Sequence, residues 1–168
     1  YQSVTSGNVN RFSWTLVIGD NAFSVTGLSS LVIPSTVTTI GRGAFWMCES
    51  LTTMEIPDNV TTLEGAILGE CTNLTYAKIG NGVKSIGDWF FEGCQNLVSV
   101  DLGDNIEIIE KEAFLNCSNL SSINIPENVK SIGNSVFEGC KNLTSITLPH
   151  NLTEIGFYAF TFNNQGGQ

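Results

Sequence analysis

The chain has few basic residues, and they are dispersed along it. Among its 168 residues, 7 are Lys or Arg and 16 are Asp or Glu, so the net charge is −9. A nucleic-acid surface needs a basic stripe, and an anionic lipid surface needs a basic run. Neither is present, so we expect no nucleic-acid partner. No apolar stretch approaches the roughly 20 residues that span a bilayer, so we expect no direct membrane insertion.

Residues suited to catalysis or metal binding are also scarce. His150 is the only histidine, so a cysteine nucleophile would have few candidate bases. The five cysteines include no close C-x-x-C pair of the kind that holds zinc. Carboxylates at the predicted turns, such as Asp58 and Asp104, lack the spacing of a calcium loop. We therefore expect no enzymatic activity, no cofactor and no functional metal site.

The cysteines are instead strictly periodic. Cys48, Cys71, Cys94, Cys117 and Cys140 each follow the previous one by 23 residues. A residue that returns at a fixed interval occupies one recurring place in a coiled chain, and this period lies within the range of leucine-rich repeats. Disulfide pairing would require alternate coils to depart from the repeat. We therefore interpret the cysteines as a structural ladder of buried free thiols.

Six units of 23 residues follow from this period, and their positions are numbered from a leading Leu. They begin at Leu28, Leu51, Leu74, Leu97, Leu120 and Leu143. Positions 4 and 6 are apolar in every unit, for example Ile123 and Ile125, which indicates a strand with one buried face. Pro or Gly at position 7 ends that strand. Positions 10 and 13 hold only Val, Ile or Leu and predict a second short extended segment.

The end of each unit carries Ala-Phe-x-x-Cys or a close variant at positions 17 to 21. This segment contains no Pro, and we interpret it as one helical turn that is too short to stand alone. Position 18 is Phe in five units and Leu68 in the other, so a phenylalanine column should fill the core. Position 14 is Gly in four units but Glu64 and Glu110 in two, which argues against an obligatory positive φ there.

One coil cannot bury its apolar face alone, but stacked coils can. We predict a single leucine-rich repeat solenoid domain over residues 1–168, with a parallel β-sheet on one face, short second strands and short helical turns. Parallel strands lie about 4.8 Å apart, so six coils would form a body roughly 30 Å long. Residues 1–27 would form a half-repeat and cap containing Phe12, Trp14 and Leu16; residues 28–165 would form the six repeats and 166–168 a tail.

The two ends of the sequence suggest an excised chain. The sequence starts with Tyr1 rather than Met and has no signal-peptide pattern. Asn163 replaces the expected cysteine of the last unit, and no separate C-terminal cap follows. We therefore expect a mature or excised chain, with a cut from something longer as the preferred interpretation.

The predicted strand suggests a binding surface. Positions 3 and 5 should project into solvent because positions 4 and 6 point inward. The candidate binding residues on these positions are Glu55, Tyr76, Lys78, Ser99, Asp101 and Asn124. A tyrosine among small hydroxyls and paired charges is a reasonable hot spot for protein binding. A solvated strand face without a ligand is the alternative.

Two of these carboxylates also permit a glycosidase hypothesis. Paired acids for glycoside hydrolysis stand about 5–10 Å apart in a cleft. Glu55 and Asp101 would lie two coils apart, about 10 Å, with Lys78 between them. A salt-bridged ladder across the strands explains this arrangement better.

The pattern L-x-x-I-x-I-P-x-x-V-x-x-I-G-x-x-A-F-x-x-C-x-N resembles the BspA-like leucine-rich repeat family, whose 23-residue units also occur in Treponema surface proteins. The resemblance covers residues 28–165 and departs at Glu64, Glu110, Leu68 and Asn163. It implies a surface-exposed protein of host-associated bacteria or parasitic protists that serves in adhesion and binds host proteins. It supplies no binding-residue motif.

These observations favour a non-enzymatic, extracellular adhesion or protein-interaction module. Its strand face would be presented to a host or extracellular-matrix protein. A carbohydrate-binding or spacer module of a larger surface protein is the alternative.

Overall fold

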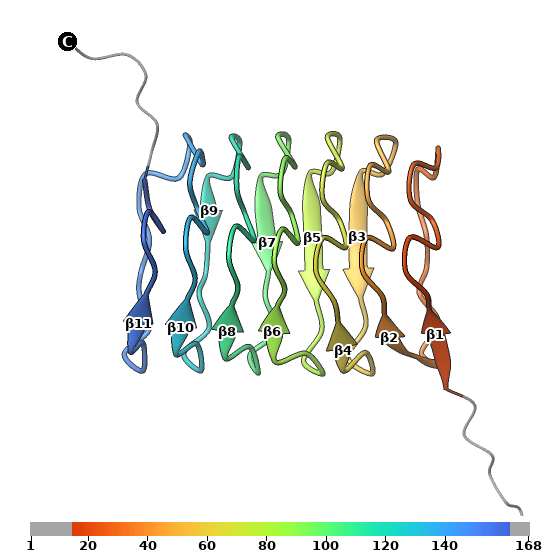
Figure 1. Cartoon of the computed structure of the whole chain (residues 1–168), viewed down its shortest axis with the longest axis horizontal. Coiled ribbons are helices and arrows are strands. Elements are labelled where there is room, and N and C mark those ends of the chain that lie inside the picture. The colour runs from red at the N-terminus through yellow and green to blue at the C-terminus, as the bar shows by residue number, and fades with distance from the viewer. Residues whose placement is uncertain (1–14, 162–168) are drawn as a thin grey trace, which may run out of the picture.

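The chain winds into a row of stacked coils, as the computed structural model shows (Figure 1). The structure describes residues 15–161. Phe12 and Trp14 of the predicted cap, and Asn163 at the other end, lie outside the described residues. Each coil contributes one or two short strands and a turn segment, and successive coils lie side by side along the long axis.

The strands form two rows that run in opposite directions (Figure 1). The first row contains β3 (Thr53–Ile56), β5 (Tyr76–Ile79), β7 (Ser99–Asp101) and β9 (Ser122–Ile123). The second row contains β1 (Leu16–Ile18), β2 (Val37–Ile40), β4 (Thr62–Leu63), β6 (Ser85–Ile86), β8 (Ile108–Ile109), β10 (Ser131–Ile132) and β11 (Glu154–Ile155).

All strand pairs are parallel. The first row is one sheet in the order β3-β5-β7-β9, and Met54, Ala77 and Val100 share one register position in it. The second row consists of a sheet β1-β2-β4 and a sheet β11-β10-β8-β6. The predicted leucine-rich repeat solenoid, with a parallel sheet and short second strands, is thus confirmed. The first and last units differ, because residues 28–33 and 143–148 belong to no strand.

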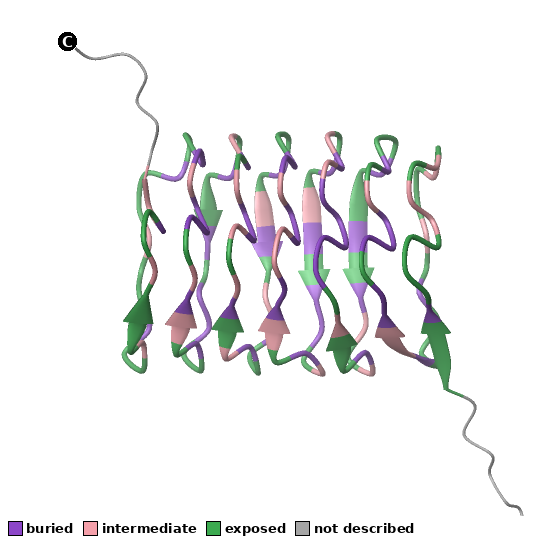
Figure 2. Cartoon of the chain, in the orientation of Figure 1, coloured by how far each residue is buried: buried purple, intermediate pink, exposed green. Residues whose placement is uncertain are grey.

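The core lies between the two rows. Buried and exposed residues alternate along β3 and β5, so Met54, Ile56, Ala77 and Ile79 point inward (Figure 2). The predicted phenylalanine column is present, with ring centroids 5.1 Å apart for Phe91 and Phe114 and 5.3 Å apart for Phe114 and Phe137. This column and the inward strand residues make one continuous hydrophobic cluster along the stack.

The phenylalanine column is interrupted in the second unit, and the third unit carries an extra buried ring. Leu68 replaces Phe in the second unit, and the third unit supplies an additional buried ring, Phe90, beside it. The amide of Leu68 donates a hydrogen bond to the Phe90 carbonyl at 2.9 Å, and the Phe90 ring lies 4.7 Å from that of Phe91. The coil after Leu68 thus contributes two buried rings, Phe90 and Phe91, to the core.

The predicted helical turn at positions 17–21 is wrong. In the described residues this segment is a series of turns, because left-handed backbone recurs at two places in each coil. Positive φ occurs at positions 16 and 20 and at the equivalent residues before Leu28. The residues are Asn21, Val25, Gly43, Met47, Ala66, Glu70, Trp89, Gly93, Glu112, Asn116, Ser135, Gly139 and Tyr158.

Backbone hydrogen bonds explain this alternation. In an α-helix each amide would bond within its own segment, whereas here alternate amides bond to the following coil. Ala66, Leu68 and Glu70 donate to the carbonyls of Asp88, Phe90 and Glu92 at 2.7, 2.9 and 2.6 Å. The same three positions donate across the other coil interfaces between Asn21 and Thr161. The turn segments therefore form a third ladder along the stack.

The prediction that position 14 requires no positive φ is confirmed. None of Gly41, Glu64, Gly87, Glu110, Gly133 and Gly156 has a positive φ. A Cβ at Gly133 would lie 2.7 Å from the Lys111 amide nitrogen of the preceding coil, so close backbone approach favours glycine there instead.

We expect Phe114→Ala to lower the free energy of unfolding by about 3–5 kcal/mol, because it removes a fully buried ring from the middle of the column. Urea denaturation followed by circular dichroism measures this change. Phe157→Ala is the matched control, since that ring is 80% exposed and its loss should change little. Similar losses for both variants would contradict the proposed contribution of the column.

We expect Val25→Gly to raise the free energy of unfolding by about 0.5–1 kcal/mol. Val25 has φ 56° and is 70% exposed, so glycine relieves left-handed strain and loses little burial. Val98→Gly makes the same chemical change at an exposed residue without positive φ, and should be destabilising by about 0.5–1 kcal/mol. Chemical denaturation of both variants measures the sign, and the same sign for both would refute the assignment.

Candidate binding surface

The outward residues of the first strand row form a flat polar surface, here called the strand face. Glu55, Lys78 and Asp101 follow one another across β3, β5 and β7 in direct register. All three side chains are exposed, because the residues on either side of them in each strand point into the core. Tyr76 lies beside Ser99 in the same register and is half-buried.

Two polar contacts hold these side chains in place. The Lys78 ammonium pairs with Glu55 at 2.9 Å, and the Tyr76 hydroxyl donates to Asp101 Oδ2 at 2.6 Å. Lys78 was predicted between two carboxylates, but its ion pair in the described residues is with Glu55, and Asp101 accepts from Tyr76 instead. The hydrogen bond to Asp101 raises the pKa of Tyr76, and the bond to Glu55 raises the pKa of Lys78.

The remaining candidates lie at the edge of this group. Ser99 is half-buried on β7 and pairs in register with Ser122 of β9. Asn124 is exposed and lies one residue beyond β9. The structure thus brings Glu55, Tyr76, Lys78, Ser99 and Asp101 together on three neighbouring strands, while Asn124 continues the same outward row on the next coil.

A hollow next to Glu55 was not predicted from the sequence. It has a volume of about 280 Å³ and is backed by apolar groups of the first unit, including Leu31, Val32 and Ile33, with Pro57 on the other side. Val32 is 88% exposed, although it is a large apolar residue. The signal was available, because Val32 is apolar at position 5, where its neighbours in the column are mostly polar or charged.

The cysteines form a buried column of free thiols behind the turn segment. Each thiol donates to the carbonyl at position 18 of the preceding coil, as Cys71 does to Phe45 at 3.1 Å and Cys94 does to Leu68 at 3.1 Å. A cysteine at this position is small and apolar and supplies one weak donor. The thiols thus link successive coils without a covalent bond.

The column starts with a residue that sequence reasoning overlooked. Thr26 stands three residues after Phe23, as each cysteine stands three after position 18, and its hydroxyl donates to the Phe23 carbonyl at 2.7 Å. The Cys48 thiol also donates to that carbonyl, at 3.0 Å. A hydroxyl therefore replaces the thiol where the stack begins in the described residues.

The remaining titratable groups form no metal-binding cluster in the part of the chain that the structure describes. His150 is exposed at a turn, with Nδ1 3.5 Å from Glu127 Oε2. Within residues 15–161, no three His, Cys, Asp or Glu side chains are grouped closely enough to hold a metal ion. That part of the chain also contains no helix of the length and apolarity needed to cross a membrane.

The buried thiols make stability depend on alkaline pH. Burial raises the pKa of Cys71 to about 12 and raises the pKa values of Cys94 and Cys117 well above their ordinary value. The unfolded chain loses these protons above about pH 8.5, while the native chain keeps them. We therefore expect the thiols' contribution to be constant below about pH 8.5, to be lost progressively above it, and to be gone once the pH exceeds the native pKa values.

Urea denaturation between pH 7.5 and 10.5, with a phosphine reductant present, measures this loss. The free energy of unfolding of Cys94→Ala should fall less steeply with pH than that of the parent chain, because one buried thiol is gone. The two slopes should differ by up to about 1.4 kcal/mol per pH unit. Lysine and tyrosine titrations are common to both chains and cancel in the comparison. Identical pH slopes would show that Cys94 keeps an ordinary pKa in the native state.

Comparisons with known proteins agree with this architecture. The profile described as "BspA type Leucine rich repeat region" matches residues 16–120 and 67–165 in six copies. A leucine-rich repeat protein from Bacteroides ovatus is 33% identical with a TM-score of 0.78, and the match covers 83% of this chain and 36% of that one. One from Eubacterium ventriosum is 34% identical with a TM-score of 0.81, covering 85% and 40%.

A more distant structure, the leucine-rich repeat protein of T. pallidum, is 26% identical with a TM-score of 0.60, covering 86% of this chain and 57% of that one. No curated protein matches the chain at a significant level. The matches cover less than half of the Bacteroides and Eubacterium proteins, so this chain spans only part of their length. On the repeat match and these structures, the chain belongs to the BspA-type leucine-rich repeat family.

Proposed function

We propose that this chain is a non-enzymatic protein-interaction segment of a surface-exposed protein, and that it takes part in adhesion to a host or extracellular-matrix protein. Its membership in the BspA-type repeat family supports an interaction role. The division into a half-repeat over residues 1–27, six repeats over 28–165 and a tail over 166–168 belongs to the same proposal.

The observation that carries this proposal is the arrangement of paired side chains on the strand face. Tyr76 projects from a parallel sheet, and its hydroxyl is held by Asp101 at 2.6 Å. The adjacent Lys78 is held by Glu55 at 2.9 Å. Side chains that are ordered before binding lose little entropy on association, and tyrosine is enriched among interface hot spots.

The hollow beside Glu55 extends this face toward the first unit. Its apolar wall of Leu31, Val32 and Ile33 could bury one apolar side chain of a partner, while Glu55 and Lys78 offer charge-assisted contacts beside it. A buried apolar contact surrounded by polar groups is the usual anatomy of a protein interface. The partner that fits is therefore a folded protein surface with a protruding apolar residue flanked by polar groups.

A carbohydrate-binding or spacer role is the alternative. A panel of immobilised extracellular-matrix proteins and a glycan array separate these functions. Binding to a matrix protein supports adhesion, whether or not a glycan binds at another site. Glycan binding alone supports the carbohydrate role, and no binding in either assay supports a spacer.

Against a matrix protein that binds, Tyr76→Ala and Lys78→Ala should each weaken affinity, and the double variant should weaken it at least about tenfold. Biosensor measurements of the dissociation constant test this. Lys141→Ala is the matched control, because Lys141 is exposed but follows the turn segment and lies on neither strand row. Unchanged affinity in the double variant would remove the strand face from the interaction.

A further inference from the structure

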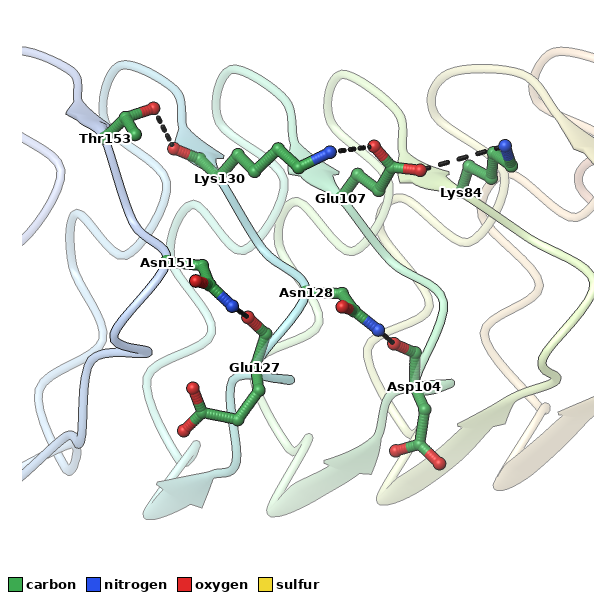
Figure 3. Close-up of polar contacts among 8 residues, drawn as sticks. All are labelled: Lys84, Asp104, Glu107, Glu127, Asn128, Lys130, Asn151 and Thr153. Atoms are coloured by element: carbon green, nitrogen blue, oxygen red, sulfur yellow. Dashed lines mark hydrogen bonds and ion pairs between the residues drawn. The ribbon is translucent and has the colours of Figure 1, made fainter.

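A separate polar hollow lies along the turns that lead into β6, β8 and β10 of the second strand row. Its volume is about 330 Å³, which lies at the small end of ligand sites. The hollow is lined by Lys84, Asn105, Glu107, Asn128 and Lys130, which come from three consecutive coils. Figure 3 shows Lys84, Glu107 and Lys130 in a row along the stack.

The charges in this hollow favour a single negative group. Lys130 contacts Glu107 Oε2 at 2.6 Å, whereas Lys84 lies 3.8 Å from Glu107 Oε1 and its side chain is 78% exposed. The hydrogen bond to Lys130 lowers the pKa of Glu107, so this carboxylate stays ionised. Two lysines around one glutamate leave one net positive charge here, although the whole chain carries −9.

The asparagines are held in fixed positions at the same hollow. Asn105 Nδ2 donates to the Asn81 carbonyl at 2.7 Å, and Asn128 Nδ2 donates to the Asp104 carbonyl at 2.8 Å. Figure 3 shows the second of these bonds and its repeat one coil later between Asn151 and Glu127. An amide can make further hydrogen bonds, because Nδ2 has two protons and Oδ1 accepts. Each asparagine thus retains capacity for a donor and an acceptor contact.

A second hollow continues this surface toward the N-terminus. It has a volume of about 160 Å³ and is lined by Thr61, Thr62 and Ser85 among others, and Lys84 borders both hollows. Lys84 thus joins two hollows that together extend over four coils, and the second also has the apolar side chains Leu63 and Val83. This length suits a short chain of rings better than a compact ion.

We propose that this surface binds an acidic saccharide, a hydroxyl-rich ring that carries one carboxylate. Lys84 and Lys130 would hold the carboxylate, and Asn105, Asn128 and Glu107 would exchange hydrogen bonds with ring hydroxyls. The main hollow is lined by polar and charged side chains, so an apolar ligand has no partner in it.

This site is independent of the strand face, because none of the residues that line it belongs to that face. Loss of protein binding through Tyr76 would leave it intact, and the reverse also holds. The two proposals can therefore fail separately.

Nuclear magnetic resonance titration of the ¹⁵N-labelled chain tests the proposal with three probes: methyl glucuronide, methyl glucoside and acetate. Only methyl glucuronide combines a carboxylate with ring hydroxyls. We expect it to shift the side-chain amide resonances of Asn105 and Asn128 with saturation in the millimolar range, and to bind more weakly as salt is raised. The other two probes should cause clearly smaller shifts at equal concentration.

Lys84→Gln should weaken glucuronide binding by about two- to fivefold, as expected for one exposed charge pair, and Lys84→Gln combined with Lys130→Gln should abolish it. Lys141→Gln is the control and should bind like the parent. Equal shifts with acetate, equal shifts with methyl glucoside, no shifts with any probe, or unchanged affinity in the double variant would each overturn the proposal. Since the lysines are exposed, circular dichroism should confirm that the variants fold.

Discussion

Each coil of this protein depends on the next to satisfy its backbone amides. Parallel strand bonds join the coils on two sides, and the turn segments join them on the third, as in the donation of Leu68 to Phe90. Leaving a buried amide without a hydrogen-bond partner costs more free energy than the satisfied hydrogen bond contributes on balance. The spacing of the stack is therefore fixed by hydrogen bonds, and the side chains inside must fill a space whose height cannot vary.

This constraint explains which residues recur. The stacked phenylalanines, with centroids 5.1–5.4 Å apart, occupy the centre, and the coil after Leu68 supplies a second buried ring, Phe90. The thiols fit the remaining corner, where a small group must donate to a carbonyl of the preceding coil. Thr26 occupies the equivalent position in the first described coil, where its hydroxyl donates to the Phe23 carbonyl of its own coil.

The period, the strands and the buried columns could be predicted from the sequence because burial imposes apolar residues at fixed positions. The left-handed residues could not, because Ala66, Trp89 and Glu112 share no side-chain property, and hydrogen bonds between coils hold their backbone instead. The pairing of Tyr76 with Asp101 could not be predicted either, because the strand register places Lys78 beside both Glu55 and Asp101 and does not say which of them it contacts. The hollow lined by Lys84 and Lys130 depends on outward residues, which the repeat leaves free to vary.

The third ladder gives the molecule a polarity. In every turn segment between Asn21 and Thr161, the bonded amides point toward the C-terminal coil and the carbonyls they meet point back. Peptide dipoles aligned in this way add, as they do along a helix. The turn segments at the two edges of the stack are consequently unlike, with free carbonyls toward one edge and free amides toward the other. Any repeat inserted into such a body, by recombination or by design, can join only head to tail.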